Sequence, residues 1–150
     1  MGQSLVKNYL HIVFSTKHRQ PMIVPSIEEE LYKYISGICR SLESPAIRVG
    51  GYLDHVHVLC SLSKNIALCG LLEELKGHSS KWIKTKGHSF SNFYWQNGYG
   101  AFSVNYRGVD AVAAYIENQH EHHMKKSFQT EYRALLNEYQ VEYDERYIWL

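Results

Sequence analysis

The sequence predicts an α+β fold: a ferredoxin-like or RRM-like split βαβ antiparallel sheet with helices on one face and further helices at the C-terminal end. Three observations predict it. Short segments rich in β-branched and aromatic residues alternate with longer segments whose apolar residues recur every three or four positions. These segments follow one another in the order β-α-β-β-α-β. A chain of 150 residues is long enough for one hydrophobic core, so we expect one domain over residues 1–150.

The first strand and the first helix are indicated by composition and by a capping signal. Residues 9–15 read YLHIVFS, a composition typical of a strand. Ser26 with Glu29 three residues later forms a capping-box pattern, and apolar residues then recur at helical spacing. We expect this helix to end near Ser44 and Pro45, because the residue before a proline disfavours the helical conformation.

A hairpin and a second helix are expected next. Residues 47–52 and 55–62 are strand-like and can pair through Leu53 and Asp54. A second amphipathic helix follows, and its far side and end are rich in lysine. Its apolar face comprises Leu68, Leu71, Leu72, Leu75, Ser79, Trp82 and Ile83.

The C-terminal third is expected to contain two short strands and two helices. The stretch FYWQNGYGAFSV, residues 93–104, predicts two aromatic strands around the turn dipeptide Asn97-Gly98. A third helix is expected over residues 110–123, and a fourth after a cap at Ser127. This order completes the split βαβ arrangement, which hosts many functions, so the function has to be argued from the site.

Composition excludes several classes of protein. The formal net charge is only +1, so an electrostatic case for nucleic acid has to rest on local patches. Three cysteines without a C-x-x-C pair fit neither a disulfide framework nor a zinc knuckle. No stretch is apolar for long enough to span a membrane or to act as a signal peptide. We therefore expect a cytoplasmic protein.

Two histidines in the strand-like stretch GGYLDHVHVLC raise the first functional hypothesis. Side chains alternate between the two faces of a strand, so His55 and His57 point to the same side while Val56 and Val58 point to the other. If the valines face the helix-covered core, the imidazoles lie on the open face, where they can form half of a metal site. A pair of surface histidines without a ligand is the alternative.

The stretch AAYIENQ on the third predicted helix offers partners for these histidines. Tyr115 and Gln119 are four residues apart and share one face of the helix. A glutamine oxygen with two imidazoles makes a sparse site suited to Mg²⁺ or Mn²⁺ against a phosphate. A tyrosine beside such an ion can attack a phosphodiester, although Tyr115 is equally explained as an ordinary residue of an amphipathic helix.

Several segments together resemble one family. In chain order these are YLHIVFSTKHRQ, DHVHVLCSL, LKGHSSKWI, FYWQNGYGAFSV and AAYIENQ. The sequence resembles the single-tyrosine HUH transposases, the small insertion-sequence transposases of the two-hundred/six-hundred-and-five group, over nearly the whole chain. His55-Val56-His57 matches the histidine–hydrophobic–histidine motif, Tyr115 falls on the nucleophile, and Gln119 falls on the third metal ligand.

The resemblance implies a reaction and its partners. It implies binding of single-stranded DNA with a hairpin near the element end. Tyr115 then attacks the scissile phosphate to give a 5′-phosphotyrosine link and a free 3′-hydroxyl, and a hydroxyl from another end resolves the link. The resemblance also implies a homodimer in which the tyrosine helix of one subunit can complete the histidine pair of the other.

Phosphate contacts are expected from local polar groups. The candidate DNA-binding residues are Lys7, Lys17, Arg19, Lys76, Lys81 and Lys84, and the family resemblance implies that His78 also contacts DNA. Each of the lysines is equally explained as a solvated surface residue. Trp95, Tyr99 and Phe102 can stack on unpaired bases or pack in the sheet core. We expect His120, His122 and His123 to spread around a helix surface rather than bind the ion, and the role of His11 is open.

Other readings lead to different experimental outcomes. A non-catalytic single-stranded nucleic-acid-binding module on the same sheet needs neither metal nor nucleophile. A domesticated HUH nickase uses the same chemistry and is separated from a transposase only by genomic context. A small metal hydrolase that uses water would leave free ends without attached protein.

Overall fold

The split βαβ order is present in the computed structural model, which describes residues 2–150; Met1 of the predicted domain lies outside the described residues. The strands are β1 (Tyr9–Ser15), β2 (Ala46–Tyr52), β3 (His55–Ser61) and β4 (Gly100–Ser103). The helices are α1 (Pro25–Ser41), α2 (Leu68–Lys84), α3 (Val109–Glu117), α4 (Gln119–His123) and α5 (Phe128–Glu138). All strand pairs are antiparallel, in the order β2-β3-β1-β4. Within residues 2–150 no helix is long and apolar enough to cross a membrane.

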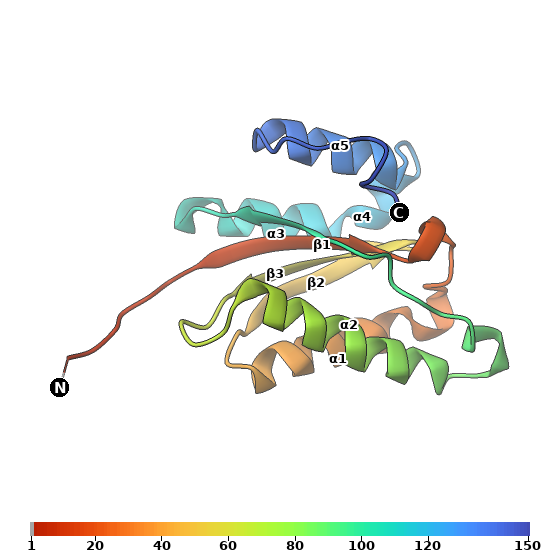
Figure 1. Ribbon diagram of the computed structural model, residues 1–150, viewed down its shortest axis with the longest axis horizontal. Helices are drawn as coiled ribbons and strands as arrows, with labels where there is room; N and C mark the ends of the chain where they lie inside the picture. Colours follow the sequence, from red (N-terminus) through yellow and green to blue (C-terminus); the bar gives the residue numbers. More distant parts are fainter. Residues whose placement is uncertain (1) are drawn as a thin grey trace.

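The sheet is covered on both faces. Figure 1 shows α1 and α2 on one face, α3 and α4 across the other, and α5 beyond them. The larger core lies between the sheet and α1 and α2, where side chains such as Ile12, Phe14, Val56 and Val58 are fully or almost fully buried. A smaller core of Val13, Phe102, Phe128 and Leu136 lies under α5. The C-terminal helices therefore cover the face that sequence reasoning left open.

Helix α3 lies directly against β2 because a glycine allows a close approach. A Cβ atom added at Gly50 would lie 2.8 Å from Cγ2 of Ile116 and 2.9 Å from its carbonyl oxygen. Ile116 itself is buried, 1% exposed, on the side of α3 that faces the sheet. This contact fixes how far Tyr115, the preceding residue, stands from the strands.

Three local predictions differ from the structure. Helix α1 begins at Pro25 with Val24 as its cap and no capping-box hydrogen bond, because proline suits the first turn, where an N–H has no helical partner. It ends at Ser41, shortly before the predicted end. The predicted third helix divides at Asn118 into α3 and α4, since Asn118 leaves the helical conformation (φ −93°, ψ 16°). Ser127 does cap α5, where its hydroxyl accepts the N–H of Thr130.

The aromatic stretch around Asn97-Gly98 is not a hairpin of two strands. Its second half, β4, pairs with β1, and Trp95 makes an isolated bridge with Thr16 just beyond the end of β1. Both halves therefore follow the same edge. The indole of Trp95 donates to the Ser79 hydroxyl at 2.9 Å and packs edge-on to Phe14, which anchors the first half against α2. Of the cysteines, Cys39 and Cys60 are buried as expected of small apolar residues, whereas Cys69 is exposed.

Candidate metal and tyrosine site

The two strand histidines share one face, as their alternation predicts. Strand pairing places His55 opposite Ser15 and His57 opposite Val13 of β1. Both imidazoles are 0% exposed, because α3, α4 and α5 close over them. The expectation that they lie on an open face is wrong for this reason. A buried imidazole needs polar partners, and these come from the C-terminal helices.

One carboxylate oxygen joins the imidazoles. Oε1 of Glu131, on α5, lies 3.1 Å from Nε2 of His57 and 3.3 Å from Nε2 of His55. Nε2 of His123 lies 3.1 Å from the same oxygen. Glu131 is only 2% exposed, so the cluster is enclosed.

Tyr115 and Gln119 converge on the other oxygen of the same carboxylate. The Tyr115 hydroxyl donates a short hydrogen bond to Oε2 of Glu131, and Nε2 of Gln119 donates to that oxygen at 2.8 Å. Oε1 of Gln119 lies 2.9 Å from Nε2 of His55. The structure thus brings together the four residues that the sequence singled out for catalysis and ligation.

Glu131 and His123 were missed or misjudged from the sequence. His123 was expected at the surface, yet its side chain is 2% exposed and stacks on Tyr52 at 5.6 Å between ring centroids. The short helix α4 and the turn before α5 direct it inward, which helix periodicity could not show. Glu131 left a signal, since it lies three residues after Phe128 and four before Leu135 on an otherwise apolar stripe. His120 is exposed as expected, and His122 is half-buried with Nε2 3.5 Å from Oε2 of Glu131.

Charge and burial act in opposite directions within the cluster. Burial alone would raise the pKa of Glu131, but hydrogen bonds from His123, His55 and His57 outweigh it and hold that pKa far below its ordinary range. Burial likewise favours neutral His55, but Asp54, 2.7 Å from Nδ1, and Glu131 raise its pKa to about 9. Burial dominates at His57 and lowers its pKa. At neutral pH the metal-free cluster therefore holds an ionised Glu131, a protonated His55 and a neutral His57.

Tyr115 is held in its neutral form. Burial and the adjacent Glu131 carboxylate both raise its pKa above the usual phenol value. Tyr115 nevertheless lines a cavity of about 350 Å³ between α3 and α5, together with Glu131, His11, His122 and Lys126. A phosphate that entered this cavity would meet the tyrosine oxygen and the edge of the histidine cluster together.

The donor atoms fit a divalent cation. The ligand atoms of His55, His57, His123 and Glu131 all lie within 4.8 Å of one another. Two atoms bound to one ion at about 2.1 Å lie about 3 Å apart, which matches the separations of 3.1 and 3.3 Å around Glu131. Imidazole nitrogens with carboxylate and amide oxygens suit Mn²⁺ and related ions.

The candidate phosphate-binding residues lie in different parts of the molecule. Lys17 and Lys84 flank exposed Tyr94, with ammonium nitrogens 6.0 and 4.3 Å from its ring centroid. Lys76 instead donates to the carbonyls of Gln96 and Gly98 at 2.8 and 2.5 Å, and so anchors that turn. Lys7, His78 and Lys81 are exposed, and Arg19 is half-buried.

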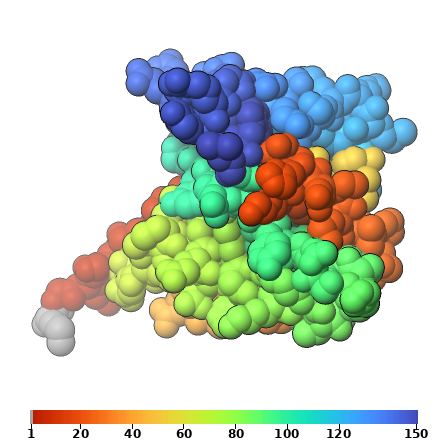
Figure 2. Space-filling view, turned by 45° about the vertical axis from the view of Figure 1, so that its right-hand side comes forward, coloured from red at the N-terminus to blue at the C-terminus, as the bar shows by residue number. Residues whose placement is uncertain are grey.

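Arg19 lies beside the C-terminal segment. Its guanidinium lies 5.4 Å from the ring centroid of Trp149 and donates to the Trp149 carbonyl at 3.3 Å. Figure 2 shows the segment after β1, in orange-red, between the dark blue C-terminal residues and the green segment near residue 90. Helix α2, which carries Lys76, His78 and Lys81, lies on the opposite face of the sheet from α3, the helix that contains Tyr115 (Figure 1). These candidates do not form one patch.

The split βαβ sheet, with a buried histidine pair that faces a tyrosine, agrees with the sequence resemblance to the insertion-sequence transposases of the two-hundred/six-hundred-and-five group. The chain belongs to the IS200-like transposase family, since residues 4–119 match the family described as "Transposase IS200 like". The matched part includes His55, His57, Tyr115 and Gln119. Glu131 and the rest of α5 lie beyond it.

Three relatives show the extent of the likeness. The ISDra2 transposase TnpA of Deinococcus radiodurans is 23% identical over 116 residues, which cover 74% of this chain and 83% of that protein. The crystal structure of a protein described as a transposase from Deinococcus radiodurans R1 has a TM-score of 0.62 at 21% identity, covering 79% of this chain and 96% of that one. The structure of a REP-associated tyrosine transposase bound to a REP hairpin has a TM-score of 0.59 at 13% identity, and the match covers 82% of this chain and 73% of that one. At these identities the two structures establish a shared fold.

Proposed function

We propose that the protein cleaves and rejoins single-stranded DNA, with Tyr115 as the nucleophile, in the transposition of an insertion sequence. One observation carries the proposal: the Tyr115 hydroxyl, Gln119 and the buried histidine pair converge on the two oxygens of Glu131. The pairing of a tyrosine oxygen with a compact set of metal-binding side chains suits covalent attack on a phosphodiester.

His55, His57 and Gln119 are the proposed ligands for Mg²⁺ or Mn²⁺, and Glu131 and His123 are close enough to complete the set. The bound ion would supply positive charge to polarise the phosphate oxygens and to lower the pKa of nearby hydroxyls. Asp54 holds Nδ1 of His55, which directs Nε2 toward the other ligands.

The covalent step follows from the position of Tyr115. Its oxygen attacks the phosphorus, the bond from phosphorus to the 3′ oxygen breaks, and a 5′-phosphotyrosine ester forms. The phenolic proton is lost to solvent and the departing 3′ oxygen takes up a proton, while the hydrogen bond to Glu131 orients the Tyr115 hydroxyl. One phosphodiester is exchanged for another, so a 3′-hydroxyl from a second end can reverse the step without an external energy source.

The proposed partners are a DNA hairpin and a second copy of the chain, in the cytoplasm. The relative that is bound to a REP hairpin supports the first. The Tyr115 hydroxyl donates to Glu131 of its own chain, and its ring centroid lies 5.8 Å from that of His57, so one chain holds a full set of these groups. In the proposed homodimer, exchange of tyrosine helices requires α3 to leave β2 by movement near Gly108, which directly precedes it.

The experiment is a denaturing gel of protein mixed with single strands that flank its own gene, with and without Mn²⁺. We expect a protein–DNA adduct from the parent and from Tyr106→Phe, an exposed tyrosine that serves as control, only when the metal is present. Tyr115→Phe should give none.

Other results would point to other functions. Cleavage by Tyr115→Phe at the parent rate would overturn the proposal. Binding without any adduct would favour the non-catalytic single-stranded nucleic-acid-binding module, and free ends without attached protein would favour a hydrolase. An adduct without element ends beside the gene would indicate a domesticated HUH nickase.

A further inference from the structure

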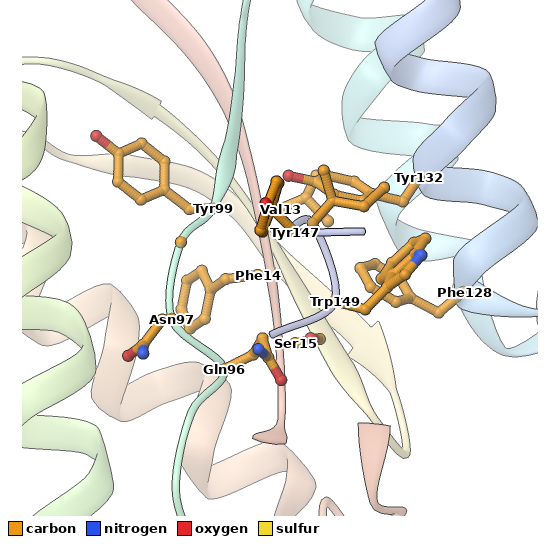
Figure 3. Close-up of a pocket in the computed structure, with 12 residues that line it drawn as sticks. Val13, Phe14, Ser15, Gln96, Asn97, Tyr99, Phe128, Tyr132, Tyr147 and Trp149 are labelled. Atoms are coloured by element: carbon orange, nitrogen blue, oxygen red, sulfur yellow. The ribbon is translucent and has the colours of Figure 1, made fainter. Parts of the chain in front are cut away.

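A second cavity lies on the other side of α5 from the Tyr115 cavity. It has a volume of about 170 Å³ and opens between β1, the segment 96–99 and the C-terminal residues. We call it the aromatic pocket, after its lining residues Phe14, Tyr99, Phe128, Tyr132, Tyr147 and Trp149. Figure 3 shows Phe128, Tyr132 and Trp149 on one side and Phe14 on the other, with Ser15 and Gln96 at one end.

Two polar groups in the aromatic pocket lack partners. Ser15 is 6% and Gln96 4% exposed, and in residues 2–150 neither the Ser15 hydroxyl nor the Gln96 amide nitrogen forms a hydrogen bond. The amide oxygen of Gln96 is already taken by the N–H of His18, at 3.1 Å. This bond fixes the orientation of the amide, so its NH₂ group is the part left free. Neither atom is sealed from solvent, since in residues 2–150 the side-chain atom that is both buried and unpartnered is Nε2 of His122, so both can offer a hydrogen bond to a molecule that enters the pocket.

The size and chemistry of the aromatic pocket suit one planar heterocycle. Its volume is well below the range of about 300–1,000 Å³ that sites for larger small molecules occupy. Flat aromatic walls offer stacking to any nucleobase. The free hydroxyl of Ser15 and NH₂ of Gln96 offer hydrogen bonds to the ring nitrogens and carbonyls at the edge of a base.

The aromatic pocket adjoins the metal and tyrosine site. The Phe128 ring, which lines the pocket, stacks on His55 with ring centroids 4.6 Å apart and planes 27° apart. Val13 and Ser15, which also line it, are the strand partners of His57 and His55. A base in the pocket would therefore belong to a nucleotide beside the scissile phosphate.

Positive charge lies at the rim of the aromatic pocket. The guanidinium groups of Arg19 and Arg133 lie 5.4 and 5.1 Å from the ring centroid of Trp149. Arg133 is paired with Glu145, whereas Arg19 forms no ion pair within residues 2–150. Arg19 is thus free to contact the sugar–phosphate backbone of a strand whose base occupies the pocket.

We propose that the aromatic pocket binds one unpaired base of the DNA strand next to the cleavage point, and that Ser15 and Gln96 select which base fits. The proposal rests on the single-stranded DNA binding proposed above, and it adds a base-selecting subsite to that function. Stacking on the aromatic walls supplies affinity, and the edge of the base meets the Ser15 hydroxyl and the Gln96 amide.

The test uses fluorescence anisotropy, without divalent cation, to measure how tightly the protein binds labelled single strands. The strands consist only of dT, only of dC or only of dA, and an abasic strand of equal length is the reference. We expect the parent to prefer one base-bearing strand over the abasic strand. Ser15→Ala should weaken binding of the preferred strand about two- to tenfold, as expected for one lost hydrogen bond, and leave the abasic strand unchanged. Gln96→Met also loses the bond to the N–H of His18, so it should weaken binding of the preferred strand at least as much. Ser36→Ala, a serine of α1 on the opposite face of the sheet, serves as control.

Parent-like binding of every strand by both Ser15→Ala and Gln96→Met would overturn the proposal. The adduct gel with Tyr115 separates the two proposals. An adduct together with parent-like pocket variants means that the base site alone is wrong. Selective weakening without any adduct supports the base site and contradicts cleavage. Failure of the parent to bind any strand contradicts both. Ser15→Ala removes no hydrogen bond within residues 2–150, so we expect it to fold.

Discussion

Nε2 of His11 lies 2.7 Å from Nδ1 of His57, and the two rings stack with centroids 5.0 Å apart. His11 is 3% exposed, and burial together with the neighbouring His57 lowers its pKa to about 3, so it is neutral. One of the two facing nitrogens must donate. The pairing fixes the orientation of the His57 ring and turns its Nε2 toward Glu131, as outer partners of metal-binding histidines commonly do. If His57 binds the ion as proposed, His11, whose role the sequence left open, acts as a positioning residue.

Removing the imidazole of His11 should lower the affinity for the metal more than it lowers the stability of the fold. We expect His11→Phe to lower Mn²⁺ affinity about 10- to 100-fold, the usual effect of losing an outer-shell partner. His11→Gln retains a side-chain amide that can bond to Nδ1 of His57 and should recover most of the affinity. Isothermal titration calorimetry with Mn²⁺ measures both. Equal affinity in His11→Phe and the parent would show that His57 needs no such support.

Glu131 should matter for stability as well as for metal binding. Glu131→Gln removes the buried charge that accepts hydrogen bonds from the histidines and Tyr115, and a glutamine cannot accept all of them. We expect a loss of about 1–3 kcal/mol in the free energy of unfolding without metal and at least a tenfold loss of Mn²⁺ affinity. Urea unfolding and calorimetry measure the two effects. Glu138→Gln, at an exposed position on the same helix, is the control. An equal loss of stability and affinity in this variant would contradict a specific contribution from the buried Glu131 carboxylate.

Local sequence patterns predicted the elements because each pattern is set by neighbouring residues. Strand alternation correctly placed His55 and His57 on one face. Tyr115 and Gln119 do converge on Glu131, but they do so across the break at Asn118 and not as neighbours on one helix face. Glu131 could not be assigned in this way, because its contact with His57 depends on how α5 returns over the sheet. That return is fixed by packing of Phe128 and Leu136 on the small core, which no local pattern reports.

The same limit explains the errors at helix ends and at the aromatic edge. The break at Asn118 lets α4, which begins at the buried Gln119, turn toward the cluster, a tertiary requirement that periodicity does not contain. The stretch around Gly98 has the turn residues of a hairpin, yet both halves pair along β1, where Trp95 and Lys76 anchor them. The turn residues correctly predicted a bend, but they did not indicate that both halves of the stretch pair along β1.

Metal binding should depend on pH through His55. Its pKa of about 9 means that the metal-free site carries a proton at His55 below that pH. An ion needs the neutral nitrogen, so binding below pH 9 releases this proton and Mn²⁺ affinity rises with pH by up to about tenfold per unit. His57, whose pKa is lowered, is already neutral and releases none. Titrations at pH 7 in two buffers of different ionisation enthalpy should show about one proton released; none released would contradict a protonated His55.

The last prediction tests whether the contact of α3 with β2 positions Tyr115. Gly50→Ala places a Cβ about 2.8 Å from Ile116, a distance that side chains do not tolerate, so α3 must move away from the strand. We expect a lower melting temperature and at least a tenfold loss of the covalent adduct. The control is Gly77→Ala in α2, where nothing lies within 4 Å of the added atom. There alanine should raise stability by about 0.5–1 kcal/mol, because glycine is unfavourable within a helix, and leave the adduct unchanged.

Since Ile116 follows Tyr115 directly, a displaced α3 carries the tyrosine oxygen away from Glu131 while His55 and His57 stay on β3. Mn²⁺ affinity should therefore fall less than adduct formation, and an equal loss of both would mean that Gly50→Ala disrupts the sheet instead.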